Sequence, residues 1–421
     1  MATDGDFYDD LETRDPEARE QALCVALPAQ IAHAKQNAPY FAALLADVNP
    51  DDITTRAALT KVPVTRKSDL MDLQKATRPL GGLNAVPAGK VRHIYQSPGP
   101  IYDVDGHAED WWGTARALYA AGFRNGDIMH NTFAYHFTPA GMMMEAGAAA
   151  IGCAVVPAGI GNTELQVHAI SDIGCTGYAG TPSFLKIILE KAADMGRDIS
   201  SLSKSCVGGE ALFPALRQEI EDHGVNCQQV YASADLGNLA YESPAREGLI
   251  VDESLLVEIV RPGTDEPVDE GEVGEVVATC YRPEYPLIRF GTGDLSCIIP
   301  GASPCGRTNM RLKGWMGRAD QTTKVKGMFV HPAQIAQVVA RHPEVLKARL
   351  VVDSRGTTDV MTLSCEVADP DHAAGGSSNL AEEITASIQA VCKLRGEVGF
   401  AAPGSLPNDG RVIDDIRDHG A

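Results

Sequence analysis

Long apolar runs are missing from this sequence, and so are the signatures of several protein classes. No apolar stretch reaches the roughly 18 residues of a membrane-spanning helix, so we expect no membrane association. Residues 1–10 are acidic rather than apolar, which argues against a signal peptide. No strand-borne GxGxxG motif occurs, which argues against a dinucleotide-dependent oxidoreductase. What remains is a globular protein, for which 44% hydrophobic and 22% charged residues are ordinary values.

Positive charge is scarce and paired cysteines are absent. The chain has 36 Lys and Arg against 56 Asp and Glu, which gives a net charge of −20. Such a balance argues against nucleic acid or an anionic membrane as a partner. Any anionic ligand would need a locally positive pocket. The ten cysteines show no CxxC or other paired spacing, which is typical of free thiols in a reducing compartment. We therefore expect a cytoplasmic protein.

The pattern along the chain predicts an α/β fold of more than one domain. A length of 421 residues suggests two or three sub-cores. Between residues 111 and 231, short apolar segments alternate with amphipathic helical ones, which indicates βαβ units on a mostly parallel sheet. The expected strands are 127–132, 154–157, 177–179, 205–207 and 228–231. Ligands of such sheets bind beyond the carboxyl ends of the strands.

The texture of the sequence changes twice after these units. From residue 249 the chain is rich in expected strands separated by Gly/Pro turns, and beyond residue 317 helices and strands alternate in the manner of a small α+β domain. The predicted fold is therefore α/β, with a large N-terminal body of mixed, mostly parallel sheets with flanking helices plus a β-rich subdomain. A small α+β C-terminal domain follows. We place the body at 1–318 and the second domain at 320–421.

Three short motifs carry chemical groups. Thr292-Gly293-Asp294 follows an expected strand and presents a carboxylate at its end. Gly208-Gly209-Glu210 follows another strand, and its glycines would let a ligand approach the backbone. Gly317-Arg318-Ala319-Asp320 precedes Lys324-x-Lys326-Gly327 and gathers three cations in an acidic protein. Singly, each is more readily explained by a turn, a tight corner or a surface charge cluster.

The order of the motifs is more specific than any one of them. From about residue 8 to residue 417 the chain resembles the phenylacetate–CoA ligase branch of the adenylate-forming superfamily. The segments that carry the resemblance are YHFTPAG at 135–141, GNTELQV at 161–167, TPS at 181–183, GGE at 208–210, YASAD at 231–235, GEVGE at 271–275, RFGTGD at 289–294, GRAD at 317–320 and KG at 326–327.

The resemblance implies an activity and its cofactors. In this family a carboxylate attacks the α-phosphate of ATP to give acyl-AMP and pyrophosphate, and CoA then displaces AMP. Two anions must approach each other, so Mg²⁺ and protein cations are needed to neutralise charge. We expect ATP/AMP, Mg²⁺ and coenzyme A as cofactors, and a small-molecule carboxylic acid as partner. A homodimer is compatible with the resemblance, although the sequence does not fix the oligomeric state.

The resemblance also implies roles for individual residues. Asp294 would hold the ribose hydroxyls, Arg318 would lie near ribose and phosphate, and Tyr231 would stack on adenine. The remaining nucleotide-binding positions would be Gly209, Glu210, Ala211, Ala232 and Ser233. Asp235 stands where the family usually has its Mg²⁺-binding glutamate. Asp320 would be the hinge about which the C-terminal domain moves as a lid.

The segment at 135–141 implies a pocket for the carboxylic acid, by the same resemblance. Its lining would be Tyr135, His136, Phe137, Ala140 and Gly141, and an aromatic or other planar acid is the natural substrate. The adjacent Met142-Met143-Met144 is read more simply as the core of a helix.

Three departures from the family pattern bear on the reaction. The counterparts of the phosphate-binding loop are Gln96, Ser97 and Gly99, in a stretch without lysine and with Pro98 and Pro100, which lack backbone donors. The acidic residues that follow, Asp103, Asp105, Glu109 and Asp110, would repel a triphosphate.

The catalytic lysine of the family's C-terminal tail is also missing. No lysine occurs after Lys393, and Arg411 takes the place either of that lysine or of a later arginine. The alternative is that Arg411 is a surface residue beside a strand. Lys326 is the next candidate for the catalytic cation. Of the Cys/His metal site found in several relatives only Cys305 is present, so we expect no structural zinc.

Two functions remain in competition. The first is an ATP-dependent acyl-CoA ligase for an aryl or related carboxylic acid. The second is a degenerate, non-adenylating relative that binds acyl-AMP, AMP or acyl-CoA, or performs only the thioester half-reaction. The altered phosphate loop and the missing lysine favour the second, whereas Asp294, Arg318, Asp320 and Lys326 favour a working nucleotide site.

Overall fold

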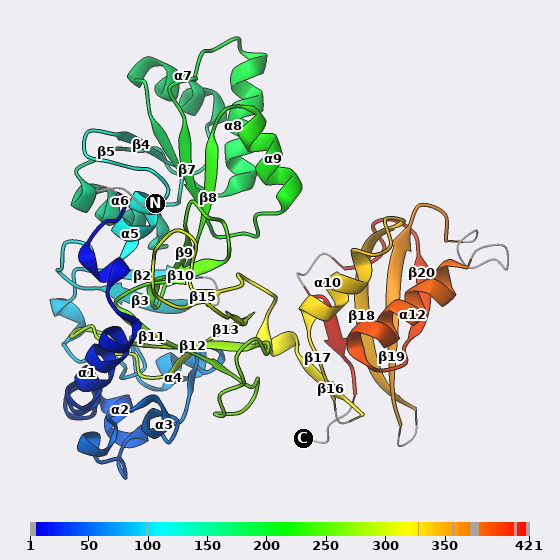
Figure 1. Cartoon of the computed structure of the whole chain (residues 1–421), viewed down its shortest axis with the longest axis horizontal. Helices are drawn as coiled ribbons and strands as arrows, with labels where there is room; N and C mark the ends of the chain where they lie inside the picture. Colours follow the sequence, from blue (N-terminus) through cyan, green and yellow to red (C-terminus); the bar gives the residue numbers. More distant parts are fainter. Residues whose placement is uncertain are drawn as a thin grey trace. The chain divides into compact units, whose positions relative to one another are not determined.

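The computed structural model of the chain describes residues 6–97, 100–326, 328–355, 358–370, 379–407 and 411–417. The chain folds into two compact units (Figure 1). The first consists of Met1–Thr292 and Ser296–Trp315, and the second of Gly293–Leu295 and Met316–Ala421. The division falls a few residues before the predicted boundary at 318–320. A hinge at Asp320 itself stays a prediction.

The central sheet of the first unit contains the predicted βαβ units. Within the described residues it has nine strands in the order β14-β15-β10-β9-β8-β7-β6-β4-β5. The strands from β5 to β8 run parallel, whereas β9, β10, β15 and β14 continue the sheet with antiparallel pairing. Their bounds are β4 Ile128–Asn131, β5 Ala154–Pro157, β6 Gly177–Gly180, β7 Lys204–Val207, β8 Asn226–Ser233, β9 Gly237–Glu242, β10 Leu249–Val251, β14 Ile298–Ile299 and β15 Arg311–Leu312.

Helices cover both faces of the parallel part of this sheet. Alternate residues of each strand point to opposite sides, so Ala179 and Cys206 join one buried cluster while Tyr178 and Val207 join another. The first cluster includes helices α5 Thr114–Ala120 and α6 Ala140–Ile151. The second includes α7 Thr163–Ile173, α8 Pro182–Asp194 and α9 Pro214–Asp222. The sequence pattern predicts helices at 111–121, 139–151, 164–172, 182–195 and 214–223. Each observed helix begins within one residue of its predicted start, except α5, which begins three residues later.

A second sheet and the N-terminal helices form the rest of the first unit. The sheet has the order β1-β13-β12-β11 and packs with α1 in one large hydrophobic core. A hairpin of two strands, β2 and β3, contributes to the same core. The bounds are α1 Pro16–Asn37, α2 Pro39–Leu44, α3 Arg56–Leu59, α4 Leu70–Ala76, β1 Thr65–Arg66, β2 His93–Ser97, β3 Ile101–Asp105, β11 Leu255–Val260, β12 Gly274–Cys280 and β13 Phe290–Ser296.

The second unit is the predicted small α+β domain. Its sheet has the order β20-β19-β18-β21 and shares one hydrophobic core with helices α10 and α12. A separate hairpin, β16–β17, precedes them. The bounds are β16 Thr323–Val325, β17 Met328–Val330, α10 Pro332–Val339, β18 Val345–Arg355, β19 Thr358–Val367, α12 Leu380–Cys392, β20 Glu397–Ala401 and β21 Ile413–Asp415.

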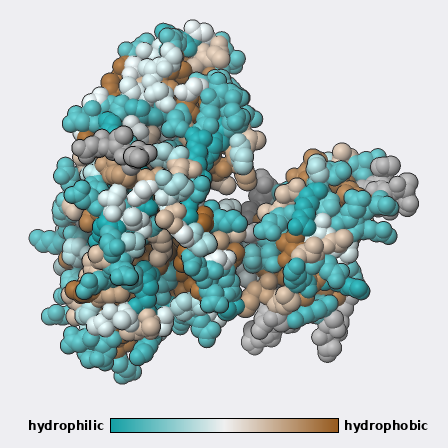
Figure 2. All heavy atoms as spheres, in the orientation of Figure 1, coloured by the Kyte–Doolittle hydropathy of each residue, from teal (hydrophilic) through white to brown (hydrophobic). Residues whose placement is uncertain are grey.

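The polarity of the surface and the character of the helices are both expected from the ordinary share of charged and hydrophobic residues. Hydrophilic residues dominate the face of each unit that Figure 2 shows, with apolar residues scattered among them. Among the described residues, none of the helices combines the length and the apolar character needed to span a bilayer.

Candidate active site

A mostly apolar cavity of about 190 Å³ lies at the carboxyl edge of the parallel strands in the first unit. Its lining includes Gly208 and Gly209 after β7, Ala232 and Ser233 at the end of β8, and Ala140 at the start of α6. Ser97, at the end of β2, also lines it. The structure thus brings together members of three predicted sets: the phosphate loop, the nucleotide site and the acid pocket.

The glycines beside the cavity are required by the backbone. A Cβ atom on Gly208 would lie 2.9 Å from the carbonyl oxygen of Val230, and Gly209 has a φ of +80°. Both conditions exclude ordinary side chains. The next residue, Glu210, accepts a hydrogen bond from the backbone N–H of Ser183 at 2.7 Å, which ties the Gly-rich turn to the start of α8. The structure therefore requires glycine at both positions, and without side chains there a ligand can approach the backbone of the turn.

Most of the predicted acid-pocket residues lie elsewhere among the described residues. Of the five, only Ala140 is part of the cavity lining. The side chain of Tyr135 accepts a hydrogen bond from Asn131 Nδ2 at 2.8 Å, and the side chain of His136 is exposed. Phe137 is 77% exposed, and its carbonyl oxygen accepts the N–H of Gln96 at 2.8 Å. Gly141 is buried in the first turn of α6.

The remaining nucleotide-site residues of the first unit lie on β8 or the Gly-rich turn. Tyr231 is half-buried and its hydroxyl donates to Thr292 Oγ1 at 3.3 Å. The Ser233 hydroxyl accepts the N–H of Leu236 at 3.1 Å. Ala211 is partly buried after the turn. Their roles toward adenine stay predictions.

A buried ionic cluster, which the sequence did not reveal, lies beside Ser97. Lys67 Nζ donates to Asp235 Oδ2 at 2.6 Å, and the Asp235 side chain is 0% exposed. Ser97 Oγ donates to Asp103 Oδ2 at 2.8 Å. The Asp103 and Asp235 carboxyls lie within reach of each other, so that a proton on one of them can be shared with the other. The predicted Mg²⁺ residue and a predicted phosphate-loop residue therefore belong to one cluster, together with a lysine.

The electrostatics of the cluster follow from its burial. Burial raises the pKa of Asp103 well above its ordinary value, and the charge of Asp235 raises it further, while Lys67 and Ser97 act in the opposite direction. Asp235 Oδ1 is buried and, apart from the facing Asp103 carboxyl, has no hydrogen-bond partner among the described residues. A carboxylate oxygen is the ligand that Mg²⁺ prefers, so Asp235 fits the predicted ion.

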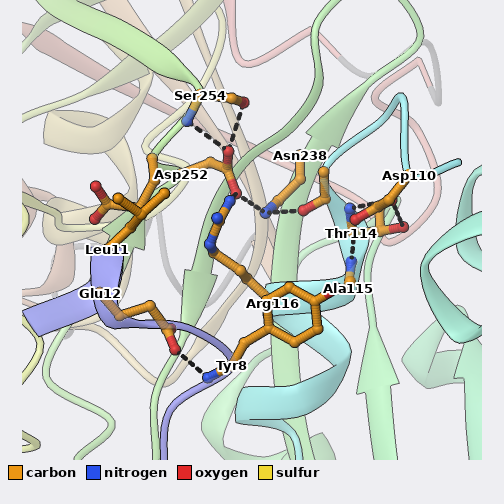
Figure 3. Close-up of polar contacts among 12 residues, drawn as sticks. Tyr8, Leu11, Glu12, Asp110, Thr114, Ala115, Arg116, Asn238, Asp252 and Ser254 are labelled. Carbon is orange, nitrogen blue, oxygen red and sulfur yellow. Dashed lines mark hydrogen bonds and ion pairs between the residues drawn. The ribbon is translucent and has the colours of Figure 1, made fainter. Parts of the chain in front are cut away.

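Two other acidic residues of this region, Asp105 and Asp110, have structural partners. Asp110 accepts the backbone N–H groups of Thr114 and Ala115, at 3.0 and 2.9 Å, at the start of α5 (Figure 3). Asp105 accepts the N–H of His93 at 2.8 Å and the hydroxyl of Tyr95 at 3.1 Å. These two carboxylates hold the hairpin and α5 in place.

In the second unit, Asp294 and Arg318 form a pair. Arg318 Nη1 donates to Asp294 Oδ1 at 3.0 Å, and the two residues also form a backbone bridge. A Cβ on Gly293, whose φ is +76°, would lie 2.6 Å from Arg318 Nη2. The glycine of the Thr-Gly-Asp motif is thus needed for the arginine to approach. Binding of ribose by this pair stays a prediction.

The predicted lid residues are placed as follows. Lys326 is exposed with a φ of +47°, and its N–H donates to Asp359 Oδ2 at 2.8 Å. Arg411 is 62% exposed and lies 3.6 Å from Asp414. Asp320 is within the short helix Ala319–Gln321. Gly99 lies outside the described residues.

The environment of Cys305 differs from that of a zinc ligand. Its Sγ lies 3.1 Å from Ser303 Oγ. Burial alone would raise the pKa of the Cys305 thiol, but hydrogen bonds from Ser243, Ser303 and Arg307 lower it below its ordinary value. No group of three or more His, Cys, Asp or Glu side chains suited to a metal occurs within the part of the chain that the structure describes. Zinc content stays a prediction for metal analysis.

Comparisons with known proteins match both units of the chain. A family model described as AMP-binding enzyme matches residues 108–280, and one described as AMP-binding enzyme C-terminal domain matches residues 327–419. The phenylacetate-coenzyme A ligase of Thermus thermophilus is 31% identical over 415 residues, which cover 93% of this chain and 91% of that protein. That of Aromatoleum evansii is 30% identical over 377 residues, covering 85% and 84%.

A solved structure has the same fold. It is an open conformation of 2-hydroxyisobutyryl-CoA ligase in complex with 2-HIB-AMP and CoA. The TM-score is 0.86 at 23% sequence identity, and the match covers 99% of this chain and 95% of that one. Both units of the chain are therefore included in the shared architecture.

Proposed function

Because this chain belongs to the phenylacetate–coenzyme A ligase family of AMP-binding enzymes, we propose that it is an ATP-dependent acid–CoA ligase. It converts an aryl or related carboxylic acid into the CoA thioester through an acyl-AMP intermediate. The observation that carries the proposal is the cavity at the strand ends, where Ser97, Gly209 and Ala140 of the predicted sets meet, in a chain 31% identical to a phenylacetate-coenzyme A ligase.

The cavity favours a small, mostly apolar acid. Its volume of about 190 Å³ is below the roughly 300 to 1,000 Å³ of sites for drug-sized ligands. Met143, Met144 and Val230 supply apolar walls, whereas Ser97 and Ser233 supply hydroxyl groups. An aryl ring would bury its faces against the apolar walls and keep its carboxylate near the hydroxyls. The Gly-rich turn would let the α-phosphate approach the backbone.

The nucleotide roles implied by the resemblance are proposed unchanged for Gly209, Glu210, Ala211, Tyr231, Ala232, Ser233, Asp294 and Arg318. Asp235 would hold Mg²⁺, which when bound neutralises phosphate charge during attack of the carboxylate. The second unit would act as a lid that moves about Asp320 between the half-reactions. With ten free cysteines among its residues, the enzyme would work in the reducing cytoplasm.

Product analysis tests the proposed activity. The protein is incubated with ATP, Mg²⁺, CoA and each of a panel of aryl and short-chain acids, and the nucleotides and thioesters are identified by mass spectrometry. We expect an aryl-CoA thioester and AMP in equal amounts. Formation of ADP, or a thioester whose yield does not depend on ATP, would contradict the proposal.

The second candidate, a relative that does not adenylate, is favoured by the sequence of the hairpin that contains the counterpart of the phosphate loop. Strands β2 and β3 pair from His93–Asp105 to Ser97–Ile101, and the segment between them has no lysine. Pro98 and Pro100 have no N–H to offer a phosphate. The hairpin therefore offers few donors and no lysine to the β- and γ-phosphates.

We therefore expect AMP, or a non-hydrolysable acyl-AMP analogue, to bind more tightly than ATP·Mg²⁺. AMP relies on the Gly-rich turn and Tyr231. It has no β- or γ-phosphate and so does not need the donors that the hairpin lacks. Isothermal titration calorimetry with each ligand measures the difference. Clearly tighter binding of ATP·Mg²⁺ than of AMP would show that the hairpin still holds the β- and γ-phosphates.

A further inference from the structure

Two buried carboxyl groups face each other where the phosphate hairpin meets the end of β8. Asp103, on β3, is 0% exposed, and Asp235, just beyond β8, is 1% exposed. Each uses one oxygen for a donor of the protein: Asp103 Oδ2 accepts from Ser97 at 2.8 Å and Asp235 Oδ2 from Lys67 at 2.6 Å. Apart from the facing carboxyl, the second oxygen of each, Oδ1, has no hydrogen-bond partner among the described residues.

A third buried oxygen near this point lacks a partner. The hydroxyl of Tyr285 makes no hydrogen bond to any described residue, and the residue is 1% exposed. Burial raises the pKa of Tyr285, and the charges of Asp103 and Asp235 raise it further, so both carboxyls are near enough to act on the phenol electrostatically. Buried polar atoms without partners are energetically unfavourable, so these oxygens suit a ligand that the protein chain itself does not supply.

The open atoms of the cluster indicate the kind of ligand that would suit it. Without a cation, a proton shared by the Asp103 and Asp235 carboxyls and the ammonium of Lys67 balance the charge of the pair. A divalent cation would displace that proton and take both carboxylates as ligands. All of the open atoms are oxygens, and hard divalent cations prefer oxygen ligands. Mg²⁺ is typically bound by one or two carboxylates, several waters and substrate phosphates. A water on such an ion would also give the Tyr285 hydroxyl a partner.

We propose that Asp103 and Asp235 together bind the divalent cation, with Asp103 as a ligand supplied by the hairpin that contains the counterpart of the phosphate loop. This inference deepens the proposed function and rests on it, because it adds a ligand to the same metal site. Ser97 and Lys67 orient the two carboxylates, as hydrogen-bond donors commonly do for metal-binding carboxylates. The carboxylate of Asp103 compensates for the side chain of Asp235, which is one methylene shorter than the glutamate that the family usually has at this position.

Binding of Mn²⁺ alone tests the proposal without any substrate. Mn²⁺ takes the same oxygen ligands as Mg²⁺, and electron paramagnetic resonance reports its free concentration. Wild type is compared with Asp103→Asn, which keeps the shape and removes the charge. The matched control is Asp105→Asn, on the same strand, whose carboxylate is already bonded to His93 and Tyr95. Thermal unfolding of each variant verifies folding.

We expect Asp103→Asn to weaken Mn²⁺ binding at least tenfold and Asp105→Asn to change it less than about twofold. If Asp103→Asn does not fold, Ser97→Ala replaces it, because loss of a supporting hydrogen bond to a ligand typically weakens metal binding about tenfold or more. Unchanged affinity in Asp103→Asn, equal losses in both variants, or no Mn²⁺ binding by wild type would overturn the inference. The pair would then hold a shared proton only. Because no acid or nucleotide is present, these outcomes are independent of whether the protein makes acyl-CoA.

Discussion

Replacing Arg411 by alanine is expected to slow acyl-AMP formation by a factor on the order of 10² to 10³. Removing a cation close to the developing charge of a transition state typically costs several kcal/mol. Arg411 is the proposed substitute for the missing tail lysine, and its side chain is 62% exposed and lies 3.6 Å from Asp414. Thioester formation from synthetic acyl-AMP should be nearly unchanged, because no carboxylate attacks phosphate in that step.

Separate assays of the two half-reactions make this measurement, and a second arginine provides the control. Arg341, at the end of α10, is also exposed on the second unit, so Arg341→Ala removes the same charge from the same unit. We expect it to alter neither half-reaction. If Arg411→Ala also leaves both rates unchanged, Arg411 is a surface residue beside β21 and the adenylating cation lies elsewhere, with Lys326 the next candidate.

Replacing Asp252 by alanine is expected to lower the stability of the first unit by about 3 to 5 kcal/mol. The Asp252 carboxylate is fully buried and accepts from Asn238 Nδ2 at 3.1 Å and from Ser254 Oγ at 2.6 Å. Arg116 lies 3.8 Å from it (Figure 3). Alanine would remove the shared acceptor and leave a largely buried guanidinium with less counter-charge.

Chemical denaturation, followed by the tryptophans of the first unit, measures this loss. Trp111 and Trp112 are buried within that unit, so their fluorescence reports its unfolding. The control is Asp222→Ala, at the exposed end of α9, which should change stability by no more than about 0.5 kcal/mol. If Asp252→Ala lowers stability by no more than Asp222→Ala does, the hydrogen bonds and ion pair of Asp252 contribute little to the stability of the first unit.

The parallel half of the fold was predictable because its signals are local. Buried strands such as 205–207 and the helices between them carry distinct periodicities, and the structure places β7 at Lys204–Val207 and α9 at Pro214–Asp222. The hairpin at 93–105 was not predicted as strands, since its glycines and prolines are typical of loops. Strand β9, Gly237–Glu242, was missed as well, because it is buried throughout and lacks the alternating pattern of a half-buried strand.

The residues of the candidate site likewise fall into those with a local sequence signal and those without one. The Gly208-Gly209 turn was found because the backbone itself demands glycine. Lys67 was not found, because it enters the site through the parallel pairing of β1 with β13, which joins Thr65 to Phe290. A contact across so many residues has no signature in one sequence. For the same reason Asp103 was interpreted as a repulsive charge near the phosphates, whereas in the structure it is bonded to Ser97.

Exchange of labelled pyrophosphate into ATP tests most directly whether this protein forms an acyl-adenylate. The reaction needs only ATP, Mg²⁺ and the acid, so it isolates the half-reaction that the altered hairpin and the missing lysine call into question. The ligase account predicts exchange that depends on an aryl or related acid and disappears without it. Absence of exchange with every acid tested, in protein that still converts synthetic acyl-AMP and CoA into thioester, would contradict that account and identify a non-adenylating relative.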